Sequence, residues 1–192
     1  MQEERLNNII KTFFEGMGFH NIEVFMSDEF AYIWDGKTHK VSYTIHDSAY
    51  NDLGFMKYVR KNYKIPECSV FTLSLLHELG HYVTLPYLNQ QKMAKCQRIK
   101  KAIDKKKVNS MEKAIAIQMR YSALYDEKVA THLAVKLLKR YYKWVLKFEY
   151  YFNEELRTRA PSNTALLLNY FYKGSGPVRT RTAACPGAPL KT

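Results

Sequence analysis

Two histidines with a glutamate between them stand at a spacing that can bind a metal ion. They lie in the stretch His77-Glu78-Leu79-Gly80-His81. On a helix, residues four apart share one face, so both imidazoles can reach the same ion. Zinc accepts such nitrogens, and Glu78, rotated by about 100° from His77, can take a proton from a water on the metal. The alternative is that both histidines only form local hydrogen bonds at the helix edge, which is costly among apolar neighbours.

A catalytic zinc site also needs a third protein ligand and an open position for water. The best candidate is Glu127, because the small residues Ala130 and Ala134 on its helical face allow a close approach to the motif helix. Asp126 and His132 are the rivals. The shorter Asp126 side chain needs a nearer helix, and His132 points elsewhere on a helix that presents Glu127, toward the substrate. An oxyanion stabiliser is required as well, and three residues are open for that role: Tyr121, Tyr125 and His132.

The two motifs resemble those of the ImmA/IrrE-type zinc metallopeptidases, within the gluzincin class. The resemblance covers roughly residues 20–140 and rests on H-E-L-G-H together with E-x-x-A-x-x-x-A-x-x-L-L, which begins at Glu127. It implies a zincin-like α+β fold and one zinc ion per chain, with His77, His81 and Glu127 as ligands and Glu78 as the general base.

The chain departs from the family pattern in three places. The 46 positions from His81 to Glu127 exceed the usual spacing, so an insertion, expected to be the basic helix, must be accommodated. Thr131 stands where the family tends to carry Asn or Asp, residues that support a ligand histidine. The proline-containing ending after the Leu-Leu pair is missing, and residues 139–142 (Lys-Arg-Tyr-Tyr) follow instead.

A small sheet is expected before the motif helix, within residues 20–46. Polar and apolar residues alternate along residues 40–45, as in a sheet with one buried face. Asp-Gly-Lys at residues 35–37 indicates a hairpin turn. Either strand of that hairpin is a candidate edge along which an extended peptide substrate binds by main-chain hydrogen bonds. The predicted strands are residues 22–26, 30–34 and 40–45.

The rest of the chain is predicted to be helical. Pro66 is typical of a helix start and Pro86 of a helix stop, so the motif helix is expected within residues 66–85. A C-terminal helical part is expected within residues 89–156, broken near Tyr121. The fold class is therefore α+β, with a small antiparallel or mixed sheet, in one domain of residues 1–173. The predicted helices are residues 3–16, 53–63, 68–85, 89–107 and 111–142, followed by the aromatic-rich residues 141–152, expected in the core or at a subunit interface.

Composition narrows the class of protein further. The chain has 192 residues, 46% of them hydrophobic, but its apolar stretches fall short of the roughly 20 residues that cross a bilayer. Its first residues are acidic rather than basic, unlike a secretory signal, and three cysteines do not make a disulfide framework. We therefore expect a cytoplasmic protein with no membrane partner. Residues 174–192, rich in Gly, Pro, Ala, Thr and Arg, are expected to be a disordered tail or an appended extension.

The net charge of +12 is concentrated in one segment. Residues 86–147 hold sixteen Lys and Arg against four Asp and Glu. A patch there would bind nucleic acid or an acidic partner, or it is a solvated helical face. We expect a narrow-specificity, regulatory zinc metallopeptidase that hydrolyses a protein or peptide; the alternative is a non-catalytic protein of the same fold that uses this surface to join nucleic acid or a larger assembly. The densest part of the patch is Lys100, Lys101, Lys105, Lys106 and Lys107.

Overall fold

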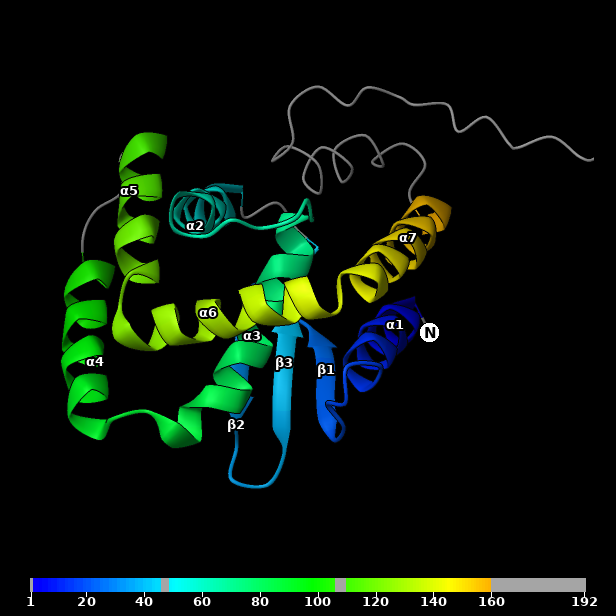
Figure 1. The fold of residues 1–192 in the computed structure, drawn as a ribbon, viewed down its shortest axis with the longest axis horizontal. Coiled ribbons are helices and arrows are strands. Elements are labelled where there is room, and N and C mark those ends of the chain that lie inside the picture. Colours follow the sequence, from blue (N-terminus) through cyan, green and yellow to red (C-terminus); the bar gives the residue numbers. More distant parts are fainter. Residues whose placement is uncertain (1, 46–48, 106–109, 160–192) are drawn as a thin grey trace, which may run out of the picture.

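The structure is a computed structural model that describes residues 2–45, 49–105 and 110–159. Over these residues the chain forms seven α-helices and one small three-stranded mixed sheet, which is an α+β arrangement dominated by helices (Figure 1). The predicted α+β class is confirmed at that level. Lys106, Lys107 and the expected tail, residues 174–192, lie outside the described residues.

The sheet has β3 (His39–Tyr43) at its centre, parallel to β1 (Ile22–Met26) and antiparallel to β2 (Ala31–Trp34). The turn between β2 and β3 forms as predicted, because Gly36 adopts a φ of 89° and Asp35 accepts hydrogen bonds from two backbone N–H groups of the turn. Of the two hairpin strands, only β2 is an edge strand. The expectation that residues 40–45 offer a free edge is therefore wrong, since β1 covers that side of β3.

The motif helix, α3 (Val70–Thr84), runs through the middle of the molecule. Its first turn is capped by Ser69, whose hydroxyl accepts a hydrogen bond from the Thr72 N–H. Pro86 lies in the 3-10 turn η1 (Leu85–Tyr87) that follows the helix. Every residue from Val70 to Gly80 is buried, so this part of α3 is enclosed on all sides.

The other helices surround α3 and the sheet (Figure 1). α6 crosses α3, β2 and β3 pack against α3, and α2 and α5 pack together. α4 contacts both α5 and α6, whereas α1 and α7 pair beside β1 on the other side of the molecule. These helices are α1 (Gln2–Glu15), α2 (Ala49–Asn62), α4 (Gln90–Asp104), α5 (Met111–Ser122), α6 (Tyr125–Arg140) and α7 (Tyr142–Arg159).

The predicted break near Tyr121 is confirmed. α5 ends at Ser122, and Leu124 is extended with a ψ of 157° before α6 begins at Tyr125. No proline or glycine forces this break. It lets α5 pack on α2 while α6 turns away to pack on α3.

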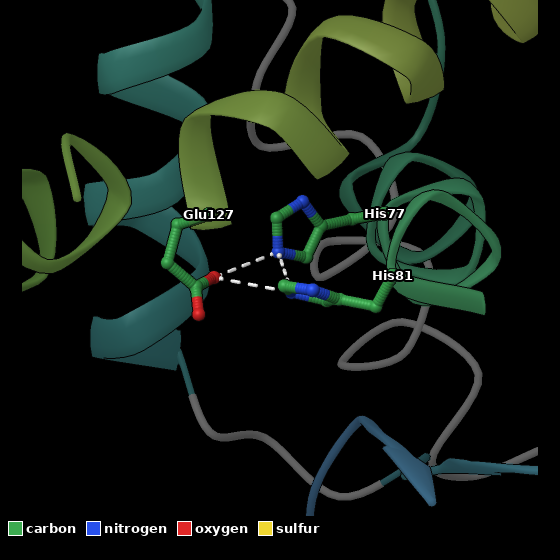
Figure 2. Close-up of side chains that lie close together, drawn as sticks. All are labelled: His77, His81 and Glu127. Carbon is green, nitrogen blue, oxygen red and sulfur yellow. Dashed lines mark hydrogen bonds and ion pairs between the residues drawn. The ribbon is translucent and has the colours of Figure 1, made fainter. Parts of the chain in front are cut away.

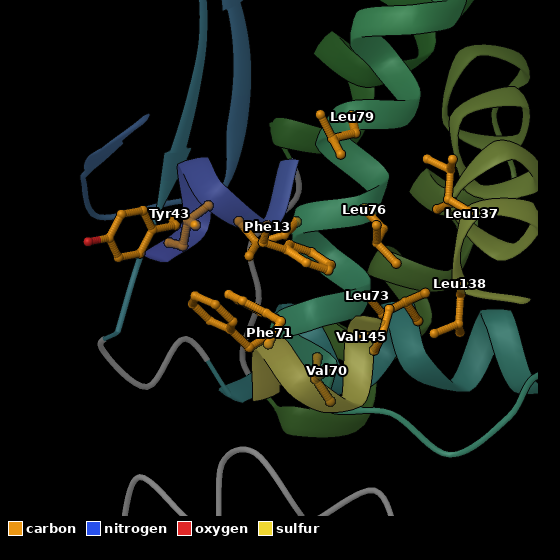
Figure 3. Close-up of a cluster of buried hydrophobic side chains, with 14 of the residues drawn as sticks. Phe13, Tyr43, Val70, Phe71, Leu73, Leu76, Leu79, Leu137, Leu138 and Val145 are labelled. Carbon is orange, nitrogen blue, oxygen red and sulfur yellow. The ribbon is translucent and has the colours of Figure 1, made fainter. Parts of the chain in front are cut away.

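The hydrophobic core joins α3 to α1, α6, α7 and the sheet (Figure 3). Aromatic side chains of α7 supply part of this core, which is one of the two locations predicted for them. Phe148 stacks on Phe13 at 4.1 Å between ring centroids, and Phe152 stacks on Phe71 at 4.4 Å. Burial of such aromatic side chains dominates the energetics of a core, and here it fixes α7 against α1 and α3.

Candidate metal centre and cleft

His77 and His81 lie on the face of α3 that meets α6. Their Nε2 atoms are 3.1 Å apart, and the two rings are nearly perpendicular. His77 is 7% exposed, and burial of a polar imidazole is costly unless its nitrogens have partners. The spacing of four residues thus has the predicted effect of placing one imidazole above the other on a buried face.

A backbone-to-backbone contact brings the second helix close enough to reach them. A Cβ placed on Gly80 would lie only 2.4 Å from the carbonyl oxygen of Ala130 on α6. Small residues on the Glu127 face were predicted to allow close packing, and Gly80 is the matching small residue on the motif helix. The two helices therefore touch directly between the histidines and the turn that carries Glu127.

Glu127 completes a group of three donors, the metal group, which consists of His77, His81 and Glu127 (Figure 2). Its Oε2 lies 2.9 Å from Nε2 of His77 and 3.4 Å from Nε2 of His81. Four-coordinate zinc with bonds of about 2.0–2.1 Å holds neighbouring ligand atoms about 3.3 Å apart. All three separations are close to that value, so the two nitrogens and the oxygen fit a tetrahedral divalent ion as three of its four ligands.

The electrostatics of this group favour a positive charge among the donors. Burial alone would raise the pKa of Glu127, but its hydrogen bonds with His77 and His81 outweigh burial and hold that pKa well below the usual range. Burial lowers the pKa of His81, yet the Glu127 carboxylate more than offsets this, so the pKa of His81 is raised. The same preference for a positive charge would favour the binding of a metal cation.

Thr131 holds the ring of His77 from behind. Its Oγ1 lies 3.1 Å from Nδ1 of His77, and the threonine is fully buried. When Nε2 of His77 binds a metal, Nδ1 carries the proton and can donate a hydrogen bond to this hydroxyl. In sequence, Thr131 was only a departure from the pattern of the family that the chain resembles. Its hydroxyl can nevertheless support a ligand histidine in place of Asn or Asp.

Glu78 sits next to the metal group, against the edge strand. Its carboxylate accepts a hydrogen bond from the backbone N–H of Tyr32 on β2. Burial raises the pKa of Glu78 above its ordinary value, and the nearby His77 and His81 counter part of this rise. A carboxylate with a raised pKa beside a metal group can first accept a proton as a general base and then donate it as a general acid.

Lys100, predicted as part of an exposed basic patch, instead points into this site. Its Nζ lies 2.6 Å from Oδ2 of Asp126 and 2.5 Å from Oε1 of Glu127. Burial lowers the pKa of Lys100, but attraction to Glu127 and hydrogen bonds with both carboxylates outweigh it and raise that pKa. Lys101 and Lys105 are exposed, so the described part of the patch does not act as one face.

An open cleft of about 960 Å³ leads to the metal group. Its lining includes Tyr32 and Trp34 of β2 together with Gln118 and Tyr121 of α5. A cleft of this size, with an edge strand on its wall, can admit an extended chain of several residues.

The structure separates the remaining candidates. Tyr121 lines the cleft, with Nζ of Lys100 4.8 Å from its ring centroid. Tyr125 is not among the cleft-lining residues, and Lys92 lies over its ring. His132 is exposed and packs beside Tyr63, away from the cleft.

The third-ligand rivals are separated in the same way. The buried Asp126 faces Lys100 rather than the histidines, and the group able to hold a metal consists of His77, His81 and Glu127. Of the three candidate oxyanion stabilisers, Tyr121 alone lines the cleft.

Comparisons with family models, curated proteins and solved structures found no match for this chain. Within the described residues, none of the helices combines the length and apolar character needed to cross a bilayer.

Proposed function

We propose that this protein is a zinc-dependent metallopeptidase with a zincin-like arrangement of its motif helix, edge strand and third-ligand helix. The observation that carries the proposal is the meeting of His77, His81 and Glu127, with mutual donor separations of 2.9–3.4 Å, beside the buried carboxylate of Glu78. Two imidazoles and a carboxylate with an adjacent general base form the donor set of zinc peptidases. The buried location, facing an open cleft, supports a catalytic rather than a purely structural ion.

The residues of the site divide the chemistry among them. A zinc ion held there would act as a Lewis acid, making a bound water more acidic and polarising the scissile carbonyl. Glu78 is placed to accept the proton of that water and to pass it to the leaving amine nitrogen. Tyr121, the one predicted oxyanion stabiliser that lines the cleft, is our candidate for a donor to the developing oxyanion.

The substrate is proposed to bind as an extended strand along β2. This strand is an edge of the sheet, and Tyr32 and Trp34 on it line the cleft. Main-chain hydrogen bonds to an edge strand align a peptide without selecting its sequence, so the side-chain surroundings of the cleft would supply the specificity.

The first test is the zinc content of purified protein, measured by mass spectrometry. We expect about one zinc per chain in the wild type, loss of zinc in His77→Ala and Glu127→Ala, and retention in His132→Ala. The last variant is a matched control, since it removes an imidazole from the same helix as Glu127 but outside the cleft. A wild type without zinc after reconstitution would refute the proposal.

A second test separates catalysis from metal binding. Glu78→Gln should keep the zinc and lose the hydrolysis of a library of internally quenched fluorescent peptides, because an amide cannot accept the proton. Turnover at the wild-type rate in this variant would exclude the role given to Glu78. If zinc is bound but no peptide is cleaved by any form, the alternative of a non-catalytic protein that associates with nucleic acid or a larger assembly gains weight.

A further inference from the structure

Lys100 connects the helix between the two ligand-bearing segments to the metal group. α4 lies between α3 and α6 in the chain and contacts α6, and Lys100 extends from it to the first turn of α6. The side chains of Asp126 and Glu127 that it meets are only 6% and 9% exposed. A lysine ammonium held by two buried carboxylates is strongly fixed in place.

The two oxygens of Glu127 have different partners. Oε2 faces Nε2 of His77 and Nε2 of His81, whereas Oε1 accepts a hydrogen bond from Lys100. A carboxylate that is free to turn can offer both oxygens to one cation. Here the second oxygen is already engaged by a positive charge that would repel a nearby metal ion.

We propose that Lys100 is a positioning residue that leaves Glu127 only one oxygen for the metal and thereby keeps the site four-coordinate when water is bound. This inference rests on the proposed metal site. It adds that Lys100 limits the number of ligands that the metal can have there. A catalytic zinc site has three protein ligand atoms and a water in the fourth position, and a second Glu127 oxygen would join these as a fifth ligand.

Asp126 has a defined part in this arrangement. Without a second carboxylate, the ammonium of Lys100 would bind Glu127 alone and could follow it toward the histidines. Oδ2 of Asp126 lies 2.6 Å from Nζ and gives the ammonium a second anchor besides Glu127. Asp126 therefore positions Lys100 rather than the metal, which gives the rejected ligand candidate a role at the same site.

The test replaces Lys100 with methionine, which has nearly the same length but no donor and no charge. Each protein is loaded with Co²⁺, whose visible absorption is intense in four-coordinate sites and weaker in five-coordinate ones. We expect a four-coordinate spectrum for the wild type and a five-coordinate one for Lys100→Met. We also expect at least a tenfold fall in peptide turnover without loss of the metal. Lys101→Met is the matched control, because it removes the same charge from the neighbouring exposed position and should keep the wild-type spectrum.

Two further variants keep the proposal refutable. Lys100→Arg keeps the charge and the donors and should restore the four-coordinate spectrum. Should Lys100→Met fail to fold, as judged by circular dichroism, Lys100→Ala admits water from the cleft to the two carboxylates and should show the same five-coordinate spectrum. A wild-type spectrum in the folded methionine or alanine variant would overturn the role of Lys100. Absence of cobalt binding by the wild type would instead overturn the metal site itself.

Discussion

Gly80 is the position where a single methyl group should test the contact that builds the metal centre. In Gly80→Ala the added Cβ would lie 2.4 Å from the carbonyl oxygen of Ala130, 2.8 Å from its carbonyl carbon and 2.9 Å from its Cα. These are backbone atoms that cannot rotate away. Restoring an ordinary contact of about 3.4 Å requires α3 and α6 to separate by about 1 Å there.

The cost can be estimated from these distances. Overpacking typically destabilises by about 1–3 kcal/mol, and the rigid partner places this case near the upper value. The higher helix propensity of alanine returns about 1 kcal/mol. The net loss in free energy of unfolding is therefore about 2 kcal/mol, which corresponds to a fall in Tm of about 4–8 °C in a domain of this size.

The same displacement should weaken the metal site. Glu127 lies one turn before Ala130 on α6, so separating the helices moves its carboxylate away from both histidines. Metal–ligand distances tolerate changes of only about 0.2 Å. We expect zinc affinity, measured by competition with a chromophoric chelator, to fall by about tenfold or more.

A matched control separates the two effects. Gly16→Ala would place a Cβ 2.4 Å from the ring of Trp144, an equally short approach between the residue that follows α1 and the side chain of a residue of α7. It should lower Tm but leave zinc affinity unchanged. Wild-type Tm and affinity in Gly80→Ala, or an equal loss of affinity in both variants, would refute the reasoning.

Two other predictions concern single side chains. Thr131→Val removes the acceptor for Nδ1 of His77 at nearly constant volume, so zinc affinity measured by chelator competition should fall about 10–100-fold. Thr131→Ser keeps the hydroxyl and should retain the wild-type affinity. Equal affinities in all three proteins would contradict the support given to His77. Burial, followed by the nearby Glu149 carboxylate, raises the pKa of the Cys68 thiol to about 12, so iodoacetamide at pH 8 should alkylate Cys68 far more slowly in native than in urea-unfolded protein, as mapped by mass spectrometry. Because the unfolded thiol loses its proton first, stability should also decrease as the pH rises above about 9, and a Cys68→Ala variant should lack that part of the decrease.

What the sequence determined by itself was local in character. The spacing of His77, Glu78 and His81 fixes their relative directions on any helix, because the rotation per residue is constant. The turn at residues 35–37 was likewise predictable from a short stretch of chain. Glu127 was favoured over Asp126 and His132 through the small residues that follow it on its helical face, and the structure brings the Glu127 carboxylate to the histidines.

Which distant groups meet at those residues depends on how the elements pack. Neither the composition nor the periodicity of α4 distinguishes Lys100 from the adjacent exposed Lys101, yet one points to Glu127 and the other to solvent. Thr131 supports His77 only because Gly80 lets the backbones of α3 and α6 touch. Whether β2 or β3 is the edge strand depended on β1 pairing with β3, and the sequence of the hairpin does not indicate which strand β1 pairs with. Helix direction and turn chemistry follow from neighbouring residues, whereas contacts between elements depend on how their whole surfaces pack.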